Sequence, residues 1–483
     1  MRKRGRNFRT TMVHPYPDPR SRFLLPALIV LLAMPTQAKA QAASPFLGSV
    51  PTGQATGGVV DLSLKEAFRL ALKYNLGMVE SGQDTRAAHA MRLRNLSALL
   101  PNISARVMAS DEQLNLRALG FNLHLPIPGF SLPVIVGPFS VADARAYYSQ
   151  ELFNWSNIKS WRSAAQLETA AQYAYQSDRD LVVFTAGNSY LLVISDQANV
   201  ESIQAQVQTA RTLYQNSVDQ NKNGVIASID LLRAQVELQT QQQRLIAAQN
   251  QLAVDKLSLA RVIGLPSGQQ FRLTDTVPYA PLGEMPLDQA LEQARSTRPD
   301  YQSAAARVRA AEQSVKAAAA ENYPTLSTAT DFGDIGNPNF GSSHETFSFA
   351  IELNIPVFQG TRVRADKLRA DAALQQRKAE LADLAGKIDD QVRTAFFNLK
   401  SSSDLVAVTR SNIDLAGQTL TQSRDRFSAG VADNLEVVQA QESVAMANQS
   451  YISSLYAFNV AKIALAQALG VAEQSALQYL GVR

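Results

Sequence analysis

The stretch TFSFAIELNIPVF, residues 346–358, decides the fold that this sequence predicts. Apolar residues stand at every second position of this stretch, and small or polar residues stand between them. Such strict alternation predicts a β-strand with one apolar face and one face that suits water. The predicted apolar face comprises Phe347, Phe349, Ile351 and Leu353, and the predicted wet face includes Glu352 and Asn354.

A second segment alternates in the same way in the first half of the chain. VADARAYYSQELF at 141–153 places Asp143 and Arg145 on its polar face, while its other face is mostly alanine. Shorter strands are expected near 102–110 and 325–332, so the sequence predicts four strands in all. The remaining long segments predict helix, and the fold class is therefore mainly α with a small β part.

Similar motifs recur in the same order in the two halves of the sequence. LSLKEAFRLAL at 62–72 resembles MPLDQALEQAR at 285–295, and GVIASIDLLRAQ at 224–235 resembles GVADNLEVVQAQ at 430–441. This order predicts two structural repeats. We assign residues 61–271 and 285–471 to the repeats, 272–284 to the linker between them, 41–60 to an N-terminal linker and 472–483 to a C-terminal tail.

Each repeat is predicted to contain one helix of about 38 residues, a β-hairpin, a very long helix and a last helix. The first helix should end at Pro101 or Pro324, because proline interrupts helical hydrogen bonding. The very long helices should span roughly 156–221 and 361–428. Heptad rows on the last helices predict coiled-coil packing, although an ordinary soluble helical bundle would also produce them. These rows are Leu231, Leu238, Leu245, Leu252 and Leu259, and Val437, Val444, Tyr451, Phe458 and Leu465.

The N-terminal 40 residues predict a secretory signal peptide. A basic region precedes the apolar run FLLPALIVLLAM at 23–34, and Ala38 and Ala40 fit the small-residue pattern before a cleavage point. A retained membrane anchor is the alternative, but the run is shorter than the about 20 residues that a span needs. The basic residues of this leader account for the net charge of +4, so we expect no nucleic-acid partner.

The four strands admit two interpretations. Residues 346–358 are long enough for a tilted membrane strand, which needs about 9–11 residues. Because four strands cannot close a barrel, a membrane barrel would require several chains, and three copies would supply twelve strands with an open lumen. In that case Phe347, Phe349, Ile351 and Leu353 face lipid, and Glu352, Asn354, Asp143 and Arg145 face the lumen. In the alternative, a soluble sheet packs its apolar face on the chain's own helices.

A motif shared by both halves identifies a family resemblance. It is Gly-x₅-(Asp/Glu)-(Leu/Val)-x-x-Ala-Gln, present at 224–235 and again at 430–441. Together with the doubled plan and the signal peptide, it resembles the TolC-like outer-membrane efflux protein family. The resemblance implies a homotrimer with a twelve-stranded barrel in the outer membrane and a long helical α-barrel in the periplasm. It also implies an exit channel of a tripartite efflux pump or type I secretion system, partnered by a periplasmic adaptor and an inner-membrane transporter.

The resemblance places the two helix–turn–helix tips at the periplasmic entrance. It implies a pore gate near Glu436, Gln439 and Asp230, with Gln439 departing from the second acid of the family's pattern. The tip turns would dock the adaptor through Gly224, Val225 and Ser228 in the first half, and through Gly430, Val431 and Asp433 in the second. The simpler alternatives are that Glu436 only favours a helix N-terminus and that the glycines only permit tight turns.

The sequence contains no pattern that predicts catalysis. It has no cysteine, and its four histidines are scattered, so we expect no enzyme, cofactor or metal site. The predicted function is passive conduction from the periplasm to the exterior, through a channel in the lipid of the outer membrane. The alternative is a secreted periplasmic coiled-coil scaffold or adaptor without a membrane barrel.

Overall fold

The chain is mainly helical and carries a small sheet part. The structure is a computed structural model, and it describes residues 44–51, 53–120, 133–277, 279–283, 285–337, 341–432 and 434–482. The predicted signal peptide, residues 1–40, lies outside the described residues.

The described residues form nine α-helices and two short 3₁₀ helices. None of these helices has the length and apolarity that crossing a membrane requires. Their bounds are η1 (Pro45–Leu47), α1 (Leu64–Tyr74), α2 (Leu76–Ser97), α3 (Trp155–Lys222), α4 (Ser228–Ile263), α5 (Leu287–Thr297), α6 (Pro299–Ala319), η2 (Ala320–Asn322), α7 (Arg362–Ser428), α8 (Asn434–Ala468) and α9 (Ala472–Leu480).

The expectation of one helix of about 38 residues at the start of each half is wrong. In the first half α1 ends at Tyr74 and α2 starts at Leu76, because Asn75 is extended and its side chain accepts a hydrogen bond from Gly77 N at 3.0 Å. In the second half Pro299 begins α6, and a proline biases the residue before it toward extended geometry. Arg298 accordingly has φ −61° and ψ 118°, which separates α5 from α6.

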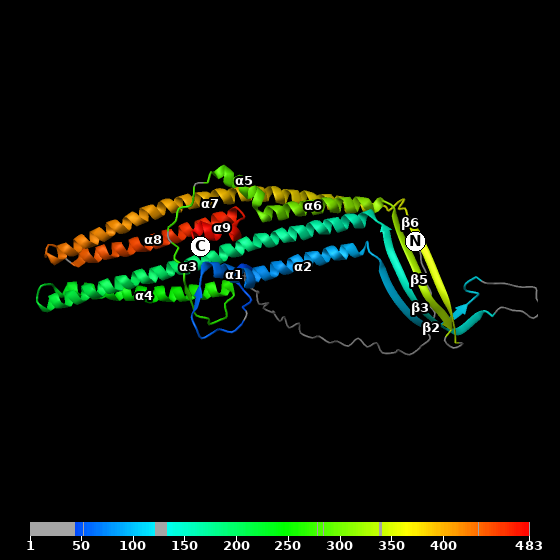
Figure 1. Ribbon diagram of the computed structural model, residues 1–483, viewed down its shortest axis with the longest axis horizontal. Helices are drawn as coiled ribbons and strands as arrows, with labels where there is room; N and C mark the ends of the chain where they lie inside the picture. Colours follow the sequence, from blue (N-terminus) through cyan, green and yellow to red (C-terminus); the bar gives the residue numbers. More distant parts are fainter. Residues whose placement is uncertain are drawn as a thin grey trace, which may run out of the picture. The chain divides into compact units, whose positions relative to one another are not determined.

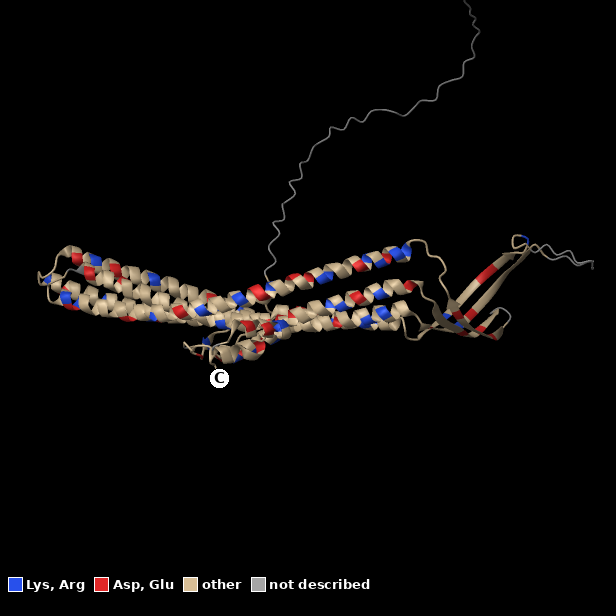
Figure 2. Ribbon diagram, turned by 90° about the horizontal axis from the view of Figure 1, so that it is seen from above, with Lys and Arg blue, Asp and Glu red and all other residues tan. Residues whose placement is uncertain are grey.

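The very long helices α3 and α7 match their predicted bounds to within one residue. At 1.5 Å per residue, the 68 residues of α3 span roughly 100 Å. Helix α3 packs along α2, α4, α6 and α8, and α7 packs along α6 and α8 (Figure 1). Acidic and basic residues are distributed along the helices and also occur on the strands (Figure 2).

The strands form two sheets. Strands β1 (Val60–Leu62) and β4 (Phe271–Leu273) pair in parallel. The larger sheet is antiparallel in the order β2-β3-β5-β6, and its strands are β2 (Asn102–Asn115), β3 (Ile135–Phe153), β5 (Thr325–Asn337) and β6 (Ser342–Asn354). Strands β2 and β6 are therefore the edges of this sheet among the described residues.

Strand β6 is displaced from its predicted position. The alternating stretch was expected to be extended as far as Phe358, but β6 ends at Asn354 and begins at Ser342, before the apolar alternation starts. Pro356 explains the early end, because proline has no N–H to donate to a neighbouring strand. The predicted apolar residues from Phe347 to Leu353 all lie inside the strand.

The largest buried core joins α1, α3, α4, α8 and α9 to the small β1–β4 sheet. Tyr190 on α3 is fully buried there, and its hydroxyl donates to Leu62 O and to the Asp275 carboxylate, each at 2.9 Å. Asp275 also accepts from Leu64 N at 2.5 Å, at the start of α1. Burial beside this carboxylate raises the pKa of Tyr190. Asp275 thus fixes the predicted linker segment to the core.

Candidate functional site

Two helix–turn–helix tips have the same backbone geometry. Gly224 follows α3 with φ +73°, and Gly430 follows α7 with φ +72°. Val225 N donates to Gln220 O, and Val431 N donates to Arg426 O, each at 2.9 Å. This bond closes the last helical turn, and a left-handed residue before it is usually glycine because a Cβ is unfavourable there. The glycines are therefore required by the turns themselves.

The predicted docking residues are exposed at these tips. Val225 is 69% exposed and Val431 is 71% exposed, so each tip turn presents one apolar side chain to the solvent. Gly224, Ser228 and Gly430 are also exposed. Asp433, the remaining predicted docking residue, lies outside the described residues. The tips thus present two apolar points to the surroundings.

Each of the two predicted gate acids has an arginine partner in the same chain. Arg233 Nη1 lies 3.1 Å from Asp230 Oδ1, one turn along α4. Arg426 Nε on α7 lies 3.3 Å from Glu436 Oε1 on α8, and Ser423 Oγ donates weakly to the same oxygen at 3.4 Å. Half-exposed ion pairs of this kind contribute about 0–1 kcal/mol. The sequence did not reveal the Arg426 partner, because it lies across the tip turn.

A small apolar cluster holds the two tips together. Leu213 of α3, Ala234 of α4 and Val437 of α8 are buried against one another. Asp230 precedes Ala234 by one turn, and Glu436 directly precedes Val437 in the chain. The predicted gate acids therefore border the contact between the two helical hairpins. Gln439, the third predicted gate residue, is exposed on α8.

Farther from the tips, the interface between the hairpins becomes polar. A cavity of about 350 Å³ lies among α3, α4, α7 and α8, and Glu237, Gln241 and Gln441 contribute to its lining. Gln241 Nε2 donates to Glu237 Oε1 at 2.8 Å, but Gln241 Oε1 and the Gln441 amide atoms have no protein partner among the described residues. The contact between the hairpins is thus polar here, unlike the apolar cluster at the tips.

The two faces of the large sheet differ in chemistry. Phe347, Phe349, Ile351 and Leu353 of β6 are 60–69% exposed, so the chain's own helices do not cover them. Strand alternation places Glu352 and Asn354 on the opposite face, where both are exposed. Asp143 and Arg145 share that face through the register of β3, β5 and β6. The structure therefore places the four apolar residues on one face of the sheet and the four polar or charged residues on the other.

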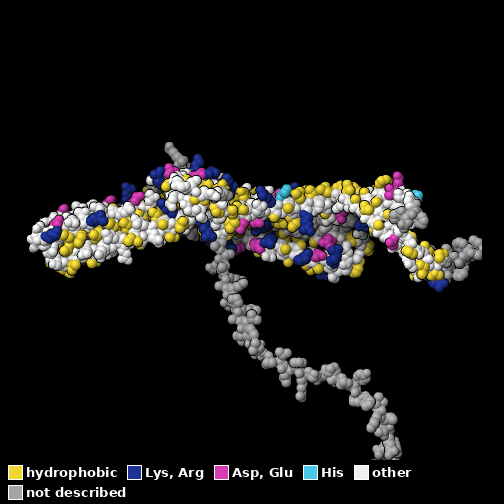
Figure 3. All heavy atoms as spheres, turned by 90° about the horizontal axis from the view of Figure 1, so that it is seen from below, with side chains coloured by type: hydrophobic (Ala, Val, Ile, Leu, Met, Phe, Trp, Pro, Cys, Tyr) yellow, Lys and Arg dark blue, Asp and Glu magenta, His cyan; other side chains and the backbone are white. Residues whose placement is uncertain are grey.

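Apolar side chains also reach the surface along the helices (Figure 3). On α4 the exposed apolar side chains follow heptad-like spacing, and we call them the α4 stripe: Ile229, Leu232, Val236, Ile246 and Leu257. A comparable α7 stripe comprises Phe397, Leu405, Val408 and Leu415. Each of these side chains is at least 50% exposed. Exposed apolar rows of this length usually mark a protein–protein contact.

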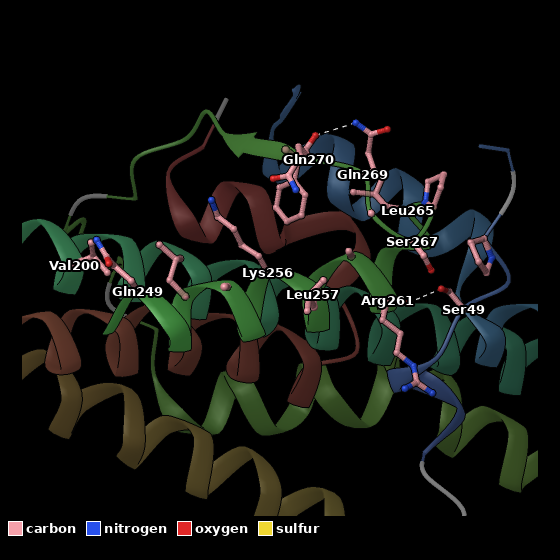
Figure 4. A pocket seen from close by; sticks show the side chains of 17 residues that line it. Ser49, Val200, Gln249, Lys256, Leu257, Arg261, Leu265, Ser267, Gln269 and Gln270 are labelled. Carbon is pink, nitrogen blue, oxygen red and sulfur yellow. Dashed lines mark hydrogen bonds between the residues drawn. The ribbon is translucent and has the colours of Figure 1, made fainter. Parts of the chain in front are cut away.

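A cavity of about 880 Å³ borders the α4 stripe at Leu257, beneath the loop that follows α4 (Figure 4). Ser49 closes one side and donates to Arg261 O, and Lys256 extends toward the ring of Phe271, 5.9 Å from its centroid. The residues that line the cavity include apolar side chains and the two cations Lys256 and Arg261, and they include no acid. This composition extends the apolar surface of α4 and offers no set of metal ligands.

Clustered metal ligands are also absent from the part of the chain that the structure describes. No group of three or more His, Asp or Glu side chains that could hold a metal ion occurs in the described ranges. His89 binds Glu168 at 2.9 Å, and the carboxylate also pairs with Arg92, so this contact joins α2 to α3.

Comparisons with known proteins agree on one family. A profile described as outer membrane efflux protein matches residues 70–265 and 290–471. The chain is 23% identical over 341 residues to the alkaline protease secretion protein AprF of Pseudomonas aeruginosa, which covers 68% of this chain and 69% of that protein. It is 24% identical to the pyoverdine export outer membrane protein OpmQ of Pseudomonas putida, with 94% of this chain and 97% of that protein covered. The crystal structure of the Campylobacter jejuni CmeC outer membrane channel superposes with a TM-score of 0.73 at 14% identity, covering 88% and 91% of the two chains.

Proposed function

The chain belongs to the outer membrane efflux protein family, and on that basis we propose that it is a trimeric exit channel. In this proposal the large sheet contributes to a membrane barrel, and the helices form a periplasmic tunnel with a gate at the tips. Conduction is passive, and the chain itself consumes no energy. The two repeats at 61–271 and 285–471 and the cleaved signal peptide are part of the same proposal.

The sheet carries this proposal. It has four strands with two open edges, one exposed apolar face and one charged face. An open edge is not tolerated in lipid, because unpaired N–H and C=O groups have no water to bind there. Pairing β6 of one copy with β2 of the next removes both edges, and three copies give twelve strands. The apolar face then meets lipid, and the charged face meets the lumen.

The helical stripes support the same ring. The α4 stripe and the α7 stripe belong to different hairpins, so the contact that they favour is heterologous: α4 of one copy against α7 of the next. A heterologous contact closes into a ring when the rotation between copies allows it. Burying the stripes in this way would stabilise the tunnel wall by roughly 25 cal/mol for each Å² of apolar surface.

The gate belongs to the tips in this proposal. Three copies of Glu436 surround the aperture, each held by Arg426 of the same chain at 3.3 Å. Separating the hairpins opens the aperture, and the polar interface around Gln241 and Gln441 leaves less apolar surface to expose in that movement. Gln439 and Asp230 line or border the aperture, and Gln439 adds no charge. The constriction is therefore less acidic than it would be with a second acid at position 439.

The tips also dock the partners. An adaptor protein would bind the exposed Val225 and Val431 with the neighbouring Gly224, Ser228, Gly430 and Asp433, and an inner-membrane transporter would supply energy and cargo. The similarity to a protease secretion protein and to a pyoverdine export protein supports export, through either a type I secretion system or an efflux pump.

Membrane fractionation and channel recording test this function. We expect the protein in the outer-membrane fraction, as a detergent-requiring trimer whose migration changes on heating, and we expect ion channels after reconstitution. A stable, detergent-free monomer that forms no channel would overturn the proposal. It would support the secreted periplasmic scaffold instead, with Phe347 and its neighbours covered by another protein.

A further inference from the structure

The charged face of the large sheet carries a connected group of side chains across three strands. We call it the Arg145 cluster: Arg106 of β2, Asp143, Arg145 and Tyr147 of β3, and Asp331 of β5. Arg145 Nε donates to Asp143 Oδ1 at 2.7 Å, and its Nη1 donates to Asp331 Oδ1 at 3.2 Å. Ser348 of β6 donates to the other oxygen of Asp331. Together with Ser348, the cluster therefore reaches from β2 to β6, the two edges of the sheet.

The backbone of β5 leaves room for the central arginine. Gly333 lies directly opposite Arg145 in the register of β3 and β5. A Cβ at position 333 would overlap Ala144 O and would lie 2.6 Å from Arg145 Cγ, so both the backbone of β3 and the arginine side chain require a glycine here. Arg145 thus lies beside a glycine, and its side chain is only 26% exposed. Its two carboxylate partners fix the guanidinium in one place.

The cluster also includes a second guanidinium. Arg106 lies 5.4 Å from the centroid of the Tyr147 ring, and Arg145 lies 6.0 Å from the same ring. Arg106 and Arg145 stand opposite each other in the register of β2 and β3. Two positive and two negative groups therefore meet, and the cluster has no net charge. Without Arg145 it would carry a net negative charge in every copy.

We propose that Arg145 determines the charge selectivity of the channel lumen, by acting as the counter-charge to Asp143 and Asp331. This inference rests on the proposed function, in which the charged face lines the lumen. Fixed charges in a narrow pore control the local concentration of permeant ions, and low-dielectric walls strengthen the effect. With Arg145 present, this cluster adds no net charge to the lumen wall. The cluster itself therefore does not repel anionic cargo.

The test measures reversal potentials of reconstituted channels in a KCl gradient. Arg145→Gln should raise the cation-to-anion permeability ratio by at least about twofold, since one charge about 10 Å away in water changes a monovalent ion's concentration by that factor. Asp331→Asn should lower the ratio. Arg272→Gln is the matched control, because Arg272 pairs with Asp61 in the β1–β4 sheet, away from the large sheet. It should leave the ratio at the wild-type value.

The opposite signs distinguish selectivity from a purely structural role. A structural ion pair would lose barrel stability in both variants and shift the ratio in neither. The inference fails if R145Q channels match R272Q channels, or if R145Q and D331N shift the ratio in the same direction. Should R145Q not assemble, D331N alone decides, because only a lowered ratio agrees with the inference. Wild-type protein that forms no channel would instead contradict the proposed function.

Discussion

Replacing Phe349 by arginine tests which solvent the apolar face of β6 meets. Phe349 is 60% exposed in the chain. In the proposed barrel this exposed surface contacts lipid. Ala350, the next residue, points to the opposite face and gives a matched control, because Ala350→Arg places the same side chain in the lumen. The two substitutions are at adjacent positions in the sequence, but their side chains point to opposite faces of the sheet.

The expected cost follows from the exposed area. A phenylalanine side chain presents about 200 Å², so 60% exposure leaves about 120 Å² for lipid to cover. At about 25 cal/mol per Å², losing that contact costs about 3 kcal/mol. An arginine on the lipid face of a membrane barrel costs roughly 2–4 kcal/mol more near the midplane. We therefore expect F349R to lose about 5–7 kcal/mol per chain and A350R to lose about 1 kcal/mol or less.

The assay is urea titration of membrane-extracted trimers, followed by their heat-dependent migration on gels. F349R should dissociate at much lower urea than wild type or should fail to reach the outer membrane, and A350R should dissociate near the wild-type midpoint. Equal midpoints for F349R and A350R would refute the reasoning, because the two substitutions should differ in cost only if one face contacts lipid. A destabilised A350R beside an unaffected F349R would show that the two faces had been assigned the wrong way round.

Three further predictions concern the helices. Glu436→Gln removes the carboxylate that pairs with Arg426 within the second tip, and three such carboxylates around the proposed aperture attract cations, so the cation-to-anion permeability ratio of single channels should fall; an unchanged ratio would remove Glu436 from the aperture. Ile246→Glu places a charge in the α4 stripe and should shift purified trimers to monomers in light scattering; trimers that persist in this variant would argue against α4 as the contact. Burial raises the pKa of Asp180 to about 6, so the folded state binds a proton at this carboxyl more tightly than the unfolded state does. The stabilisation of the fold by this proton is fully present below about pH 4 and is lost as the pH rises through 6. Asp180→Asn should therefore unfold at a higher temperature than wild type at pH 8, by up to about 3 kcal/mol of stability, and this advantage should disappear by pH 4; an advantage that does not change with pH would contradict the buried carboxylate as its source.

The sequence predicted the elements whose signals are local. Alternation with period two identified β6, because successive strand residues point to opposite faces and the polarity of each residue indicates its face. Phe347, Phe349, Ile351 and Leu353 are exposed together. The long helices were predicted to within one residue because the predicted strands end just before them and the tip glycines stand just after them. The break at Asn75 was missed, because its role depends on Phe46 O and Val262 O, which bind its side-chain amide from distant parts of the chain.

Pairs that depend on register or on a turn could not be predicted in this way. Arg145 and Asp331 lie 186 positions apart in the sequence, and only the pairing of β3 with β5 joins them. Arg426 reaches Glu436 across the tip turn, so neither helix alone reveals the contact. Arg233, by contrast, stands three residues after Asp230, and i, i+3 spacing could have identified that ion pair.

The two open edges of the large sheet have a genetic consequence. In the proposed trimer no copy can complete its own barrel, so every channel depends on the edges of its neighbours. A copy with a damaged β2 or β6 would still join a ring through its intact side and leave the ring incomplete. When such a copy is co-expressed with the wild-type protein, the damaged copy should therefore be dominant, because most mixed rings contain at least one damaged member. Damage confined to the tip turns would leave ring closure intact.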